Sequence, residues 1–443
     1  MSAVETIPGS ATAAAAVAAS VRRRSLLVIL GLAAVSGYLA YAWVAFDVSG
    51  LIGSARPDRA VILGLDSFAH KIHVEQDMRA GKLTVSVEGE RTATYQAPPD
   101  WVAVDGDRTT IDLDDGYAVT IEGAQATFAI PGYGTVVSRI EDGRIVSALP
   151  PGPVPGWMSL HSAKFDARPT LGRRLQVSRT RIEVHRYFFG WENFFFPFNS
   201  ELRQYSVGGL FDLAVSGDRL VQDIPNWRFI LDSFLGNPDW LHGEVLIALF
   251  ETILMAVLGT LTAAFVGLPL AFMAAANFTP SIVVRAVVRR LFDFLRGIDM
   301  LIWSLIFIRA FGLGPLTGAL AIAFTDTGTL GKLFSEALEN IDDKQVDGVR
   351  ATGANRLQRY RFGVIPQILP VLVSQILYYL ESNTRSATVI GALGAGGIGL
   401  LLVETMRTSK DWENTSYIIA LTILVVIAMD GMSRWLRRRL IEG

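Results

Sequence analysis

Six charged side chains stand inside or at the ends of long apolar segments of the sequence. They are Glu251, Asp299, Arg309, Asp326, Glu381 and Arg385. A charge at the centre of a membrane helix costs about 2.5–3.5 kcal/mol on insertion scales, so such residues usually face a bundle interior. Two interpretations stay open: Arg309 and Arg385 attract an anion along a path with Glu251, Asp326 and Glu381 nearby and Ser382, Asn383 and Thr384 as hydrogen-bonding neighbours, or the acids and arginines only pair and hold helices together.

A glycine run at 394–399 matches the pattern G-x-G-x-x-G. A dinucleotide site needs this pattern between a strand and a helix, whereas here it follows an apolar helical segment, so we reject that interpretation. We expect Gly396 and Gly397 to let the backbone break beside the polar residues, because irregular backbone is tolerated at membrane depth where it lines a cavity. The phosphate-binding pattern G-x-x-x-x-G-K-[ST] does not occur in the sequence, so ATP would have to bind to another chain.

Composition excludes several other kinds of site. The sequence contains no cysteine, which rules out disulfides, thiolate chemistry and cysteine–zinc sites. His70 and His73 stand three residues apart without a third ligand, so we expect no metal site. No nucleophile–base pair stands out, and we predict that the chain has no catalytic residues and is not an enzyme. The net charge of −2 gives no support for a nucleic-acid partner.

The hydrophobic content of 51%, the charged content of 19% and the mean hydropathy of +0.36 indicate a membrane bundle that carries a soluble domain. A membrane span needs about 20 apolar residues. We predict six spans, at 25–46, 245–276, 298–311, 315–334, 363–379 and 415–429. The first follows Arg22–Arg24 and exceeds the apolar stretch of about 7–15 residues in a cleaved signal peptide, so we expect a retained anchor. The alanine-rich residues 12–19 before it are expected to be disordered.

The distribution of basic residues predicts the orientation of these spans. Arg22–Arg24 place the N-terminus in the cytoplasm, so residues 1–24 form a cytoplasmic tail. Six crossings then place the basic residues near 285–290, the loop 344–361 and the C-terminal arginines inside as well. The turn at 312–314 and the segment 385–413 fall outside, and residues 47–240 form an extracytoplasmic insertion.

The insertion at 47–240 has the pattern of β-structure. Apolar residues alternate with polar ones, and the alternation is broken by Asp105-Gly106, Asp115-Gly116 and Asp142-Gly143, which signals antiparallel hairpins. We predict a small β-sandwich or meander, in which the Pro- and Gly-rich stretch 150–156 is a linker or long loop. The aromatic residues at 187–198 either pack in a core or against the bundle, or form a belt that rests on the outer leaflet.

The loop 339–354 reads as a short helix ended by glycine, with acids early and Arg350 later, as the helix dipole favours. After nine further residues the next span begins with Gly363-Val364-Ile365-Pro366. Here the chain resembles the permeases of binding-protein-dependent ABC importers, whose signature has a Glu-Ala-Ala, three residues, Gly, nine residues and Ile-x-Leu-Pro. The sequence keeps the spacing and relaxes several identities. The resemblance implies an ATPase-coupling helix at about 342–354, carried by Asp347, Gly348, Arg350, Ala351, Thr352, Gly353 and Ala354.

Residues 240–436 resemble the phosphonate-type permeases more specifically. The residues that carry this resemblance are 349–355, 364–367, 381–389 and the glycine run 394–399. It implies a type I ABC importer permease bundle with the inserted β-rich domain, a permease core at 241–443 and a location in the bacterial inner membrane. The insertion is not part of the usual core of that family.

The resemblance also implies the partners. A binding protein delivers phosphonate or a related organophosphorus anion, two ATPase subunits bind ATP and Mg²⁺, and a second copy of this chain completes a homodimer. Two alternatives remain. The same machinery could carry phosphite, a phosphate ester or methionine, or the chain could be a membrane-anchored sensor whose domain at 47–240 binds a ligand.

Overall fold

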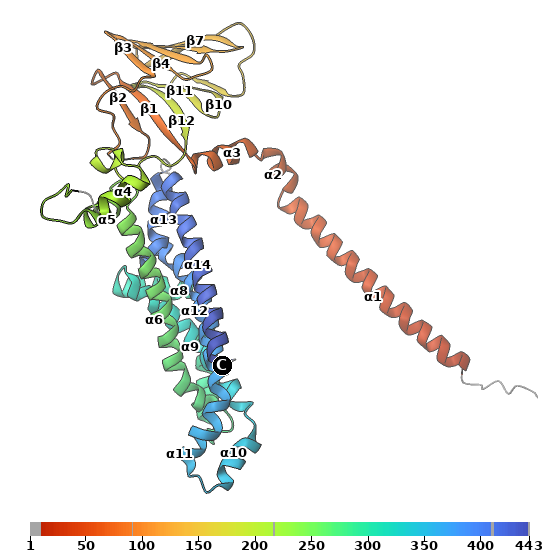
Figure 1. Cartoon of the computed structure of the whole chain (residues 1–443). Helices are drawn as coiled ribbons and strands as arrows, with labels where there is room; N and C mark the ends of the chain where they lie inside the picture. Colours follow the sequence, from red (N-terminus) through yellow and green to blue (C-terminus); the bar gives the residue numbers. More distant parts are fainter. Residues whose placement is uncertain (1–9, 91, 216–217, 409–411, 442–443) are drawn as a thin grey trace, which may run out of the picture. The chain divides into compact units, whose positions relative to one another are not determined.

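The structure is a computed structural model that describes residues 10–90, 92–215, 218–408 and 412–441. The chain divides into two compact units, Met1–Leu63 and Gly64–Gly443, and Figure 1 labels their elements. The first unit is helical, with α1 (Ser10–Ala45), α2 (Val48–Ser54) and most of α3 (Pro57–Asp66). The second unit contains all the strands and the remaining helices.

Helix α1 contains the predicted N-terminal span. Its stretch Ser20–Ala45 is 26 residues long and apolar enough to cross a membrane, and large apolar side chains such as Leu27 and Tyr38 are exposed on it. The alanine-rich residues 12–19 belong to the same helix, so the expectation of disorder there was wrong. Alanine has the highest intrinsic helix propensity, and a long apolar helix follows directly.

Two six-stranded sheets form the β-rich part of the second unit. The first sheet has the order β2-β1-β12-β11-β10-β9 and the second is a meander in the order β3 to β8. The first sheet consists of β1 (Ala69–Asp77), β2 (Lys82–Val87), β9 (Met158–His161), β10 (Lys164–Thr170), β11 (Arg173–Ser178) and β12 (Arg181–Phe189). The second consists of β3 (Val102–Asp105), β4 (Arg108–Asp112), β5 (Ala118–Glu122), β6 (Gln125–Ile130), β7 (Gly134–Glu141) and β8 (Arg144–Ala148).

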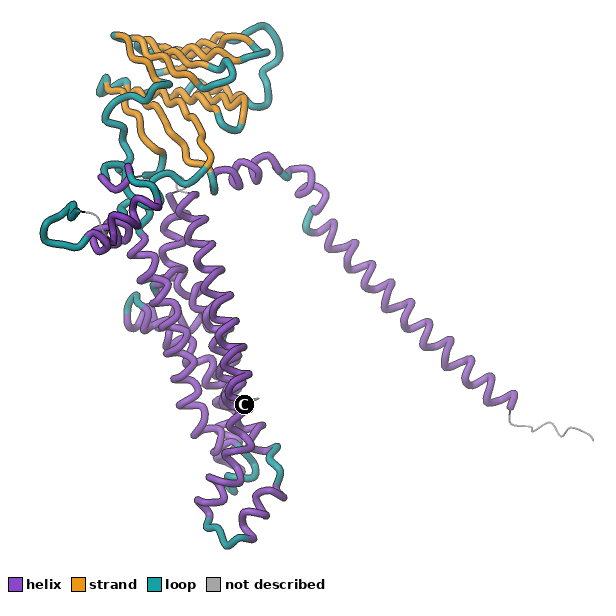
Figure 2. The backbone as a smooth tube through the Cα atoms, in the orientation of Figure 1, coloured by secondary structure: helices purple, strands orange, loops and turns teal. Residues whose placement is uncertain are grey.

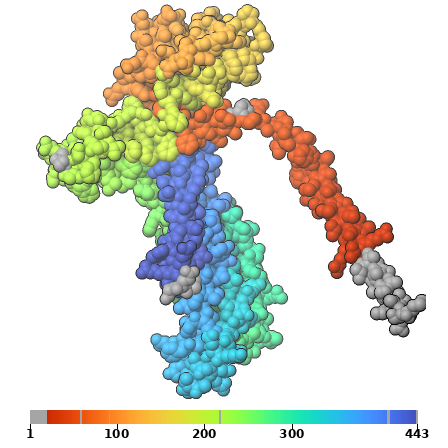
Figure 3. Space-filling view, turned by 45° about the vertical axis from the view of Figure 1, so that its right-hand side comes forward, coloured from red at the N-terminus to blue at the C-terminus, as the bar shows by residue number. Residues whose placement is uncertain are grey.

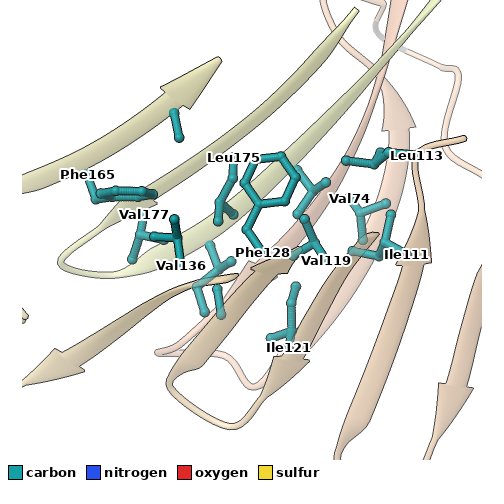
Figure 4. Packing of buried hydrophobic residues seen from close by; sticks show 14 of the residues in the cluster. Val74, Ile111, Leu113, Val119, Ile121, Phe128, Val136, Phe165, Leu175 and Val177 are labelled. Carbon is teal, nitrogen blue, oxygen red and sulfur yellow. The ribbon is translucent and has the colours of Figure 1, made fainter. Parts of the chain in front are cut away.

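The predicted hairpins and sandwich are present. Asp105-Gly106, Asp115-Gly116 and Asp142-Gly143 lie in the turns after β3, β4 and β7, and each of these glycines has a positive φ, which favours glycine. The stretch 150–156 lies between β8 and β9 and joins the two sheets. Figure 4 shows side chains from both sheets meeting in one core, which includes the fully buried Phe128 and Phe165.

A connecting segment leads from the sandwich to the bundle. It contains the 3₁₀ turn η1 (Glu201–Gln204), α4 (Val207–Val215) and α5 (Asn226–Leu235). Trp191 and Phe194 pack on Trp240 and Tyr417 at the starts of α6 and α14, with ring centroids 5.2 Å apart for Trp191–Trp240 and 5.3 Å apart for Phe194–Tyr417. Of the two interpretations of the aromatic residues, packing against the bundle is therefore confirmed for Trp191 and Phe194.

The bundle is built around α9. Its helices are α6 (His242–Ala274), α7 (Ile282–Gly297), α8 (Met300–Phe311), α9 (Pro315–Glu339), α12 (Ile365–Ile390), α13 (Gly397–Thr408) and α14 (Trp412–Ile441). Figure 2 draws them, like all helices, in purple. Helix α9 contacts α6, α7, α8 and α12. Small residues let these backbones approach closely: a Cβ at Gly331 would lie 2.3 Å from the Phe292 ring.

Four described helices are long and apolar enough to cross a membrane: Ser20–Ala45, His242–Ala274, Arg356–Ala395 and Trp412–Leu440. Helix α8 has only 12 residues. Helix α9 carries Asp326, Lys332 and many Gly and Thr residues, which lower its hydropathy, and much of its surface faces other helices rather than lipid. The number of crossings therefore stays a prediction. The predicted span 363–379 is shorter than α12, which continues to Ile390.

A histidine is buried on the face of the first sheet that points away from the second sheet. His185 on β12 is only 4% exposed, and its ring lies 5.9 Å from that of His73 on β1. Its Nε2 is 3.7 Å from the Glu88 carboxylate. Burial, together with the nearby Arg174, His73, Lys71 and Arg168, holds the pKa of His185 well below its usual range, so the imidazole is neutral at pH 7.

The burial of His185 predicts that the stability of the sandwich depends on pH. The unfolded pKa of histidine is about 6.5, above the folded value, so the unfolded chain binds more protons as the pH falls below that value. We expect the free energy of unfolding to decrease from about pH 6.5 downward, by up to about 1.4 kcal/mol per pH unit. Thermal unfolding of the full chain, followed by its β-sheet circular dichroism across this range, measures the effect.

His185→Gln should flatten this decrease, and His161→Gln, at an exposed position, should leave it unchanged. Burial raises the pKa of Glu183. Its effect on the free energy of unfolding is opposite to that of His185, because the folded state takes up the Glu183 proton at a higher pH than the unfolded state does. Both variants retain Glu183, so the difference from the wild type isolates His185. Equal slopes in wild type and His185→Gln would refute the assignment.

Candidate functional site

A buried polar cluster ties three helices together inside the bundle. The amide of Asn383 on α12 donates to the Asp326 carboxylate on α9 at 2.5 Å and to the Thr260 hydroxyl on α6 at 2.8 Å. The exposed fractions of the three residues are 1%, 2% and 0%. Because buried polar groups are costly unless they are hydrogen-bonded, the cluster is a firm cross-link between α6, α9 and α12.

Two neighbouring side chains of α6 hold the start of α13. The Glu251 carboxylate accepts a hydrogen bond from the Gly397 N–H at 3.1 Å, and the Thr252 hydroxyl accepts one from the Ile398 N–H at 2.9 Å. The first N–H groups of a helix have no partner within the helix, and a negative charge beside them is favourable. Glu251 therefore serves as a distant cap for α13.

The predicted break in the backbone occurs at the glycine run. The π-helical turn η3 (Gly391–Ala395) ends α12, and Gly394, Gly396 and Gly397 have φ values of 114°, 86° and 68°. A Cβ at Gly397 would lie 2.5 Å from the Thr252 hydroxyl. Glycine is thus required here both for its conformation and for the close approach of α6.

The remaining charges in the apolar segments have different partners. Asp299 caps the N-terminus of α8 by accepting from the Leu301 N–H. Glu381 lies 3.6 Å from Arg385 on its own helix and 3.7 Å from Arg437 on α14. Arg309 is exposed, and in the described part of the chain its side chain makes no ion pair or hydrogen bond. Only Glu381 and Arg385 therefore form a pair of the kind expected from the sequence.

The candidate path residues thus fall into two groups. Asp326, Asn383 and Thr384 are buried and serve contacts within the bundle; the Thr384 hydroxyl donates to Leu380 of its own helix. Arg309 and Arg385 are exposed and Ser382 is half-buried. Thr260, Thr252 and Arg437 were not predicted. An uncharged hydroxyl in an apolar helix gives no signal in the sequence, whereas Arg437 stands in a basic terminus.

The predicted coupling segment is an exposed helix at the other end of the bundle. Helix α10 (Asp343–Ala351) is capped by Asp342, whose carboxylate accepts from the Lys344 N–H, and none of its residues is buried. Gly353, with φ 85°, follows its end. Asp347, Gly348, Arg350, Ala351, Thr352 and Gly353 are exposed and Ala354 is half-buried.

Helix α10 rests directly on the start of α12. A Cβ at Gly363, in the turn directly before α12, would lie 3.3 Å from the Val346 Cα, so a larger residue there would press against α10. Gln367 accepts a hydrogen bond from the Asp342 N–H at 2.8 Å and donates one to the Gly363 carbonyl at 2.6 Å. Between them lie α11 (Arg356–Arg359) and the π-helical turn η2 (Tyr360–Val364). These contacts join α10 to the start of α12.

The outer side of this region is concave. An open hollow is lined by Gly348, Val349, Thr352, Gly353, Ala354, Gln358 and Phe362. The lining side chains are small or uncharged. Such a surface suits the seating of another protein rather than the binding of a charged small molecule.

Comparison with known proteins identifies the family. Residues 267–442 match the model of the binding-protein-dependent transport system inner membrane component. The phosphite transport system permease protein PtxC of Stutzerimonas stutzeri is 35% identical over 46% of this chain and 72% of its own length. The chain belongs to this family of permeases. Within it the chain is a phosphonate-type ABC permease, a helical inner-membrane subunit and not an enzyme.

Other relatives cover the permease to different extents. The cryptic phosphonate transport system permease protein PhnE2 of Escherichia coli K12 is 47% identical over 28% of this chain and 99% of its own length. The phosphate-import permease protein PhnE of Mycolicibacterium smegmatis is 37% identical over 43% of this chain and 36% of its own length. Among solved structures, the permease is similar to a chain of the inward-facing MetNI methionine ABC transporter, at 19% identity and a TM-score of 0.40, over 44% of this chain and 96% of that one.

The buried cluster of the permease predicts a strong effect of one substitution. Asn383→Leu leaves the Asp326 carboxyl group buried without its donor, which costs about 1–3 kcal/mol. We expect a lower unfolding temperature of the purified permease in detergent. The double variant Asn383→Leu, Asp326→Leu removes both partners and should recover part of the loss. Ser386→Ala, which removes only a bond to the Ser382 carbonyl, is the matched control; a loss as large in this control would contradict the cross-link.

Removal of the cap on α13 gives a second prediction. Glu251→Ala takes the acceptor away from the Gly397 N–H, and loss of a helix cap costs about 1 kcal/mol, which corresponds to about fivefold faster local opening. Hydrogen exchange of peptides that cover 391–403, measured by mass spectrometry, should speed up accordingly. Glu244→Ala, at an exposed position in the first turn of the same helix, should not change it. Unchanged exchange in Glu251→Ala would refute the capping role.

Proposed function

We propose that this chain is the membrane permease subunit of an ATP-driven importer that translocates phosphonate or a related organophosphorus anion delivered by a binding protein. The observation that carries the mechanism is the contact between the exposed helix α10 and the start of α12 through Gly363 and Gln367. The family of the chain supplies the setting in which this contact acts.

The proposed arrangement in the membrane has six crossings. They are α1, α6, the pair α7–α8, α9, the continuous stretch from α11 to η3, and α14. Helix α7 carries Arg285, Arg289, Arg290 and Arg296, and this charge supports a position of its N-terminal part at the cytoplasmic face. On this arrangement both termini and α10 lie in the cytoplasm, and the sandwich lies in the periplasm.

The coupling of ATP hydrolysis to transport would begin at the exposed helix α10. Two copies of an ATPase subunit, which bind ATP and Mg²⁺, would each bind one α10. The hollow beside Gly348 and Thr352 would form part of this contact surface. Their movement toward each other would shift α10, and α12 would follow because Gln367 and Gly363 link the two helices. The Asn383 cluster then transmits the movement of α12 to α6 and α9.

The path for the anion would lie between two copies of the permease. Asp326, Asn383 and Thr384 are occupied inside one bundle, and Glu251, Gly396 and Gly397 hold α13, so we assign them positioning roles beside the path. The exposed Arg309 and Arg385, with the half-buried Ser382, are the residues that can meet a passing anion. Glu381 restrains Arg385 through their ion pair.

Cargo chemistry is narrowed by the names of the relatives. They are described as permeases for phosphite, phosphate and phosphonate, which are all tetrahedral oxyanions of phosphorus. Phosphite is accordingly the second candidate cargo. The binding protein rather than this chain would select among these anions.

A bulky residue on α10 tests the coupling role. No atom lies within 4 Å of a Cβ added at Gly348, so Gly348→Trp leaves the fold of the free chain intact while it blocks the seat of a partner. We expect at least a tenfold loss of uptake of labelled phosphonate in a deletion strain, with ATPase subunits and binding protein present. Gly156→Trp, at an equally open glycine of the loop before β9, is the matched control.

The assay is repeated with labelled phosphite and phosphate. If the wild type takes up phosphite but neither of the other anions, the cargo is phosphite and not phosphonate, and the proposed coupling mechanism is unaffected. Normal uptake by Gly348→Trp would refute the coupling role of α10.

A further inference from the structure

Helices α4 and α5 present apolar stripes that no other part of the described chain covers. On α4, Val207, Phe211 and Val215 recur every four residues and are 81%, 69% and 72% exposed. On α5, Trp227 and Leu231 form a second stripe at the same spacing, 56% and 45% exposed. Residues four apart lie on one face of a helix, so each helix has a continuous apolar strip on its surface.

The exposed stripes are not the sides by which α4 and α5 pack against each other. The opposite sides of α4 and α5 pack in a small core of their own, in which Leu213 and Leu202 are buried and Phe229 and Ile230 are partly buried. The buried Asn226 at the start of α5 donates to the Leu213 carbonyl and so holds the two helices together. The hairpin of helices is therefore complete within itself, and its apolar strips face outward.

The position of this hairpin is fixed relative to α6. The Phe234 ring near the end of α5 stacks on His242 at the start of α6, with centroids 4.0 Å apart. A Cβ at Gly243 would lie 2.9 Å from the Leu235 carbonyl oxygen. Asn237 in the connection donates to the Asn193 carbonyl. The hairpin thus lies beside the first turn of a helix that is long and apolar enough to cross a membrane.

The lipid-facing surface of α6 begins at the same level. Leu246, Ile247 and Phe250, which follow soon after His242 on α6, are 50%, 63% and 63% exposed. Figure 3 shows the yellow-green lobe of α4 and α5 projecting sideways at the end of the bundle where α6 begins. Any bilayer that surrounds these α6 side chains must reach its surface close to this lobe.

The chemistry of the lobe fits a bilayer surface. Tryptophan is enriched at membrane–water interfaces, where its ring is apolar and its N–H can reach polar groups. Next to Trp227 and Leu231, α5 carries the exposed pair Arg228–Asp232, whose closest atoms are 3.5 Å apart. Phe195, 60% exposed, adds an aromatic side chain beside Phe234. An apolar strip next to a charged strip is the pattern of a helix that lies in the interface plane.

We propose that α4 and α5 lie in the headgroup region of the bilayer, with Val207, Phe211, Val215, Trp227 and Leu231 inserted among the lipids. The partner of this surface is the lipid itself. The proposed topology makes this the outer leaflet of the inner membrane. The lobe would fix the position, relative to the bilayer surface, of the segment that joins the sandwich to α6 and α14. The aromatic contacts of Trp191 and Phe194 hold the same segment to the bundle.

Single-cysteine labelling tests this placement, because the sequence contains no cysteine. Nitroxide labels are attached to Phe211→Cys, Val215→Cys and Trp227→Cys in the full chain, reconstituted in nanodiscs of phosphatidylethanolamine and phosphatidylglycerol. Power saturation compares the access of oxygen, which concentrates in lipid, with that of a water-soluble nickel chelate. Phe250→Cys on α6 is the lipid reference and Asp105→Cys in the β3–β4 turn is the water reference.

The expected result is a ratio of oxygen to chelate access above one at positions 211, 215 and 227, as at 250, and below one at 105. Chelate access at 211, 215 and 227 as high as at 105 would overturn the proposal, since the strips would face water. Protection from both agents would also overturn it, since a protein surface would then cover the strips. The readout does not depend on transport, so it stands apart from the test of the proposed function.

Discussion

The amide of Asn383 is the contact on which the bundle depends most. It joins a carboxylate of α9 and a hydroxyl of α6 from its position on α12, and all three side chains are buried in the bundle, where an unpaired polar group is costly. Apolar contacts in a membrane give little preference for one helix neighbour over another, because lipid tails are as apolar as leucine. A satisfied polar contact and close packing of small residues provide that preference. Gly259, Gly328 and Gly331 bring α6, α7 and α9 together, and Asn383 fixes α12 against α6 and α9.

The same helix α12 connects the two ends of the permease. At one end Gln367 and Gly363 hold α10, and at the other the chain turns at η3 into α13, whose first N–H groups are capped from α6 by Glu251 and Thr252. Irregular backbone occurs at both ends, as η2 and η3. A regular helix between two irregular ends suits a segment that moves as one body, and this is why we propose that work is transmitted along α12. Of the two exposed arginines, Arg309 makes no ion pair within the described part of the chain, whereas Arg385 on α12 is paired with Glu381.

Much of this architecture could be predicted from local sequence signals. The turns at Asp105-Gly106, Asp115-Gly116 and Asp142-Gly143 were predictable because a positive φ is a local demand, and the end of α10 at Gly353 follows from the same rule. The pairing of β1 with β12 was not predictable, since it joins segments separated by a whole second sheet. Glu251 could be recognised as a costly charge but not as the cap of α13, because the two are 146 residues apart. The segment 315–334 was predicted as a span and lies in α9, but its contacts with α6, α7, α8 and α12 needed the fold. The i, i+4 pair of Glu381 and Arg385 was visible in the sequence, whereas the contact of Glu381 with Arg437 needed the fold.

In the proposed mechanism, α10 faces the cell interior and touches a subunit that hydrolyses ATP. Site-specific photo-crosslinking from position 352, on the exposed end of this segment, tests it most directly in intact cells. We expect a single major adduct with the ATPase subunit, absent when the probe is placed at exposed position 105 of the sandwich. Adducts of position 352 with periplasmic proteins, or none with the ATPase subunit in cells that import the anion, would contradict the account.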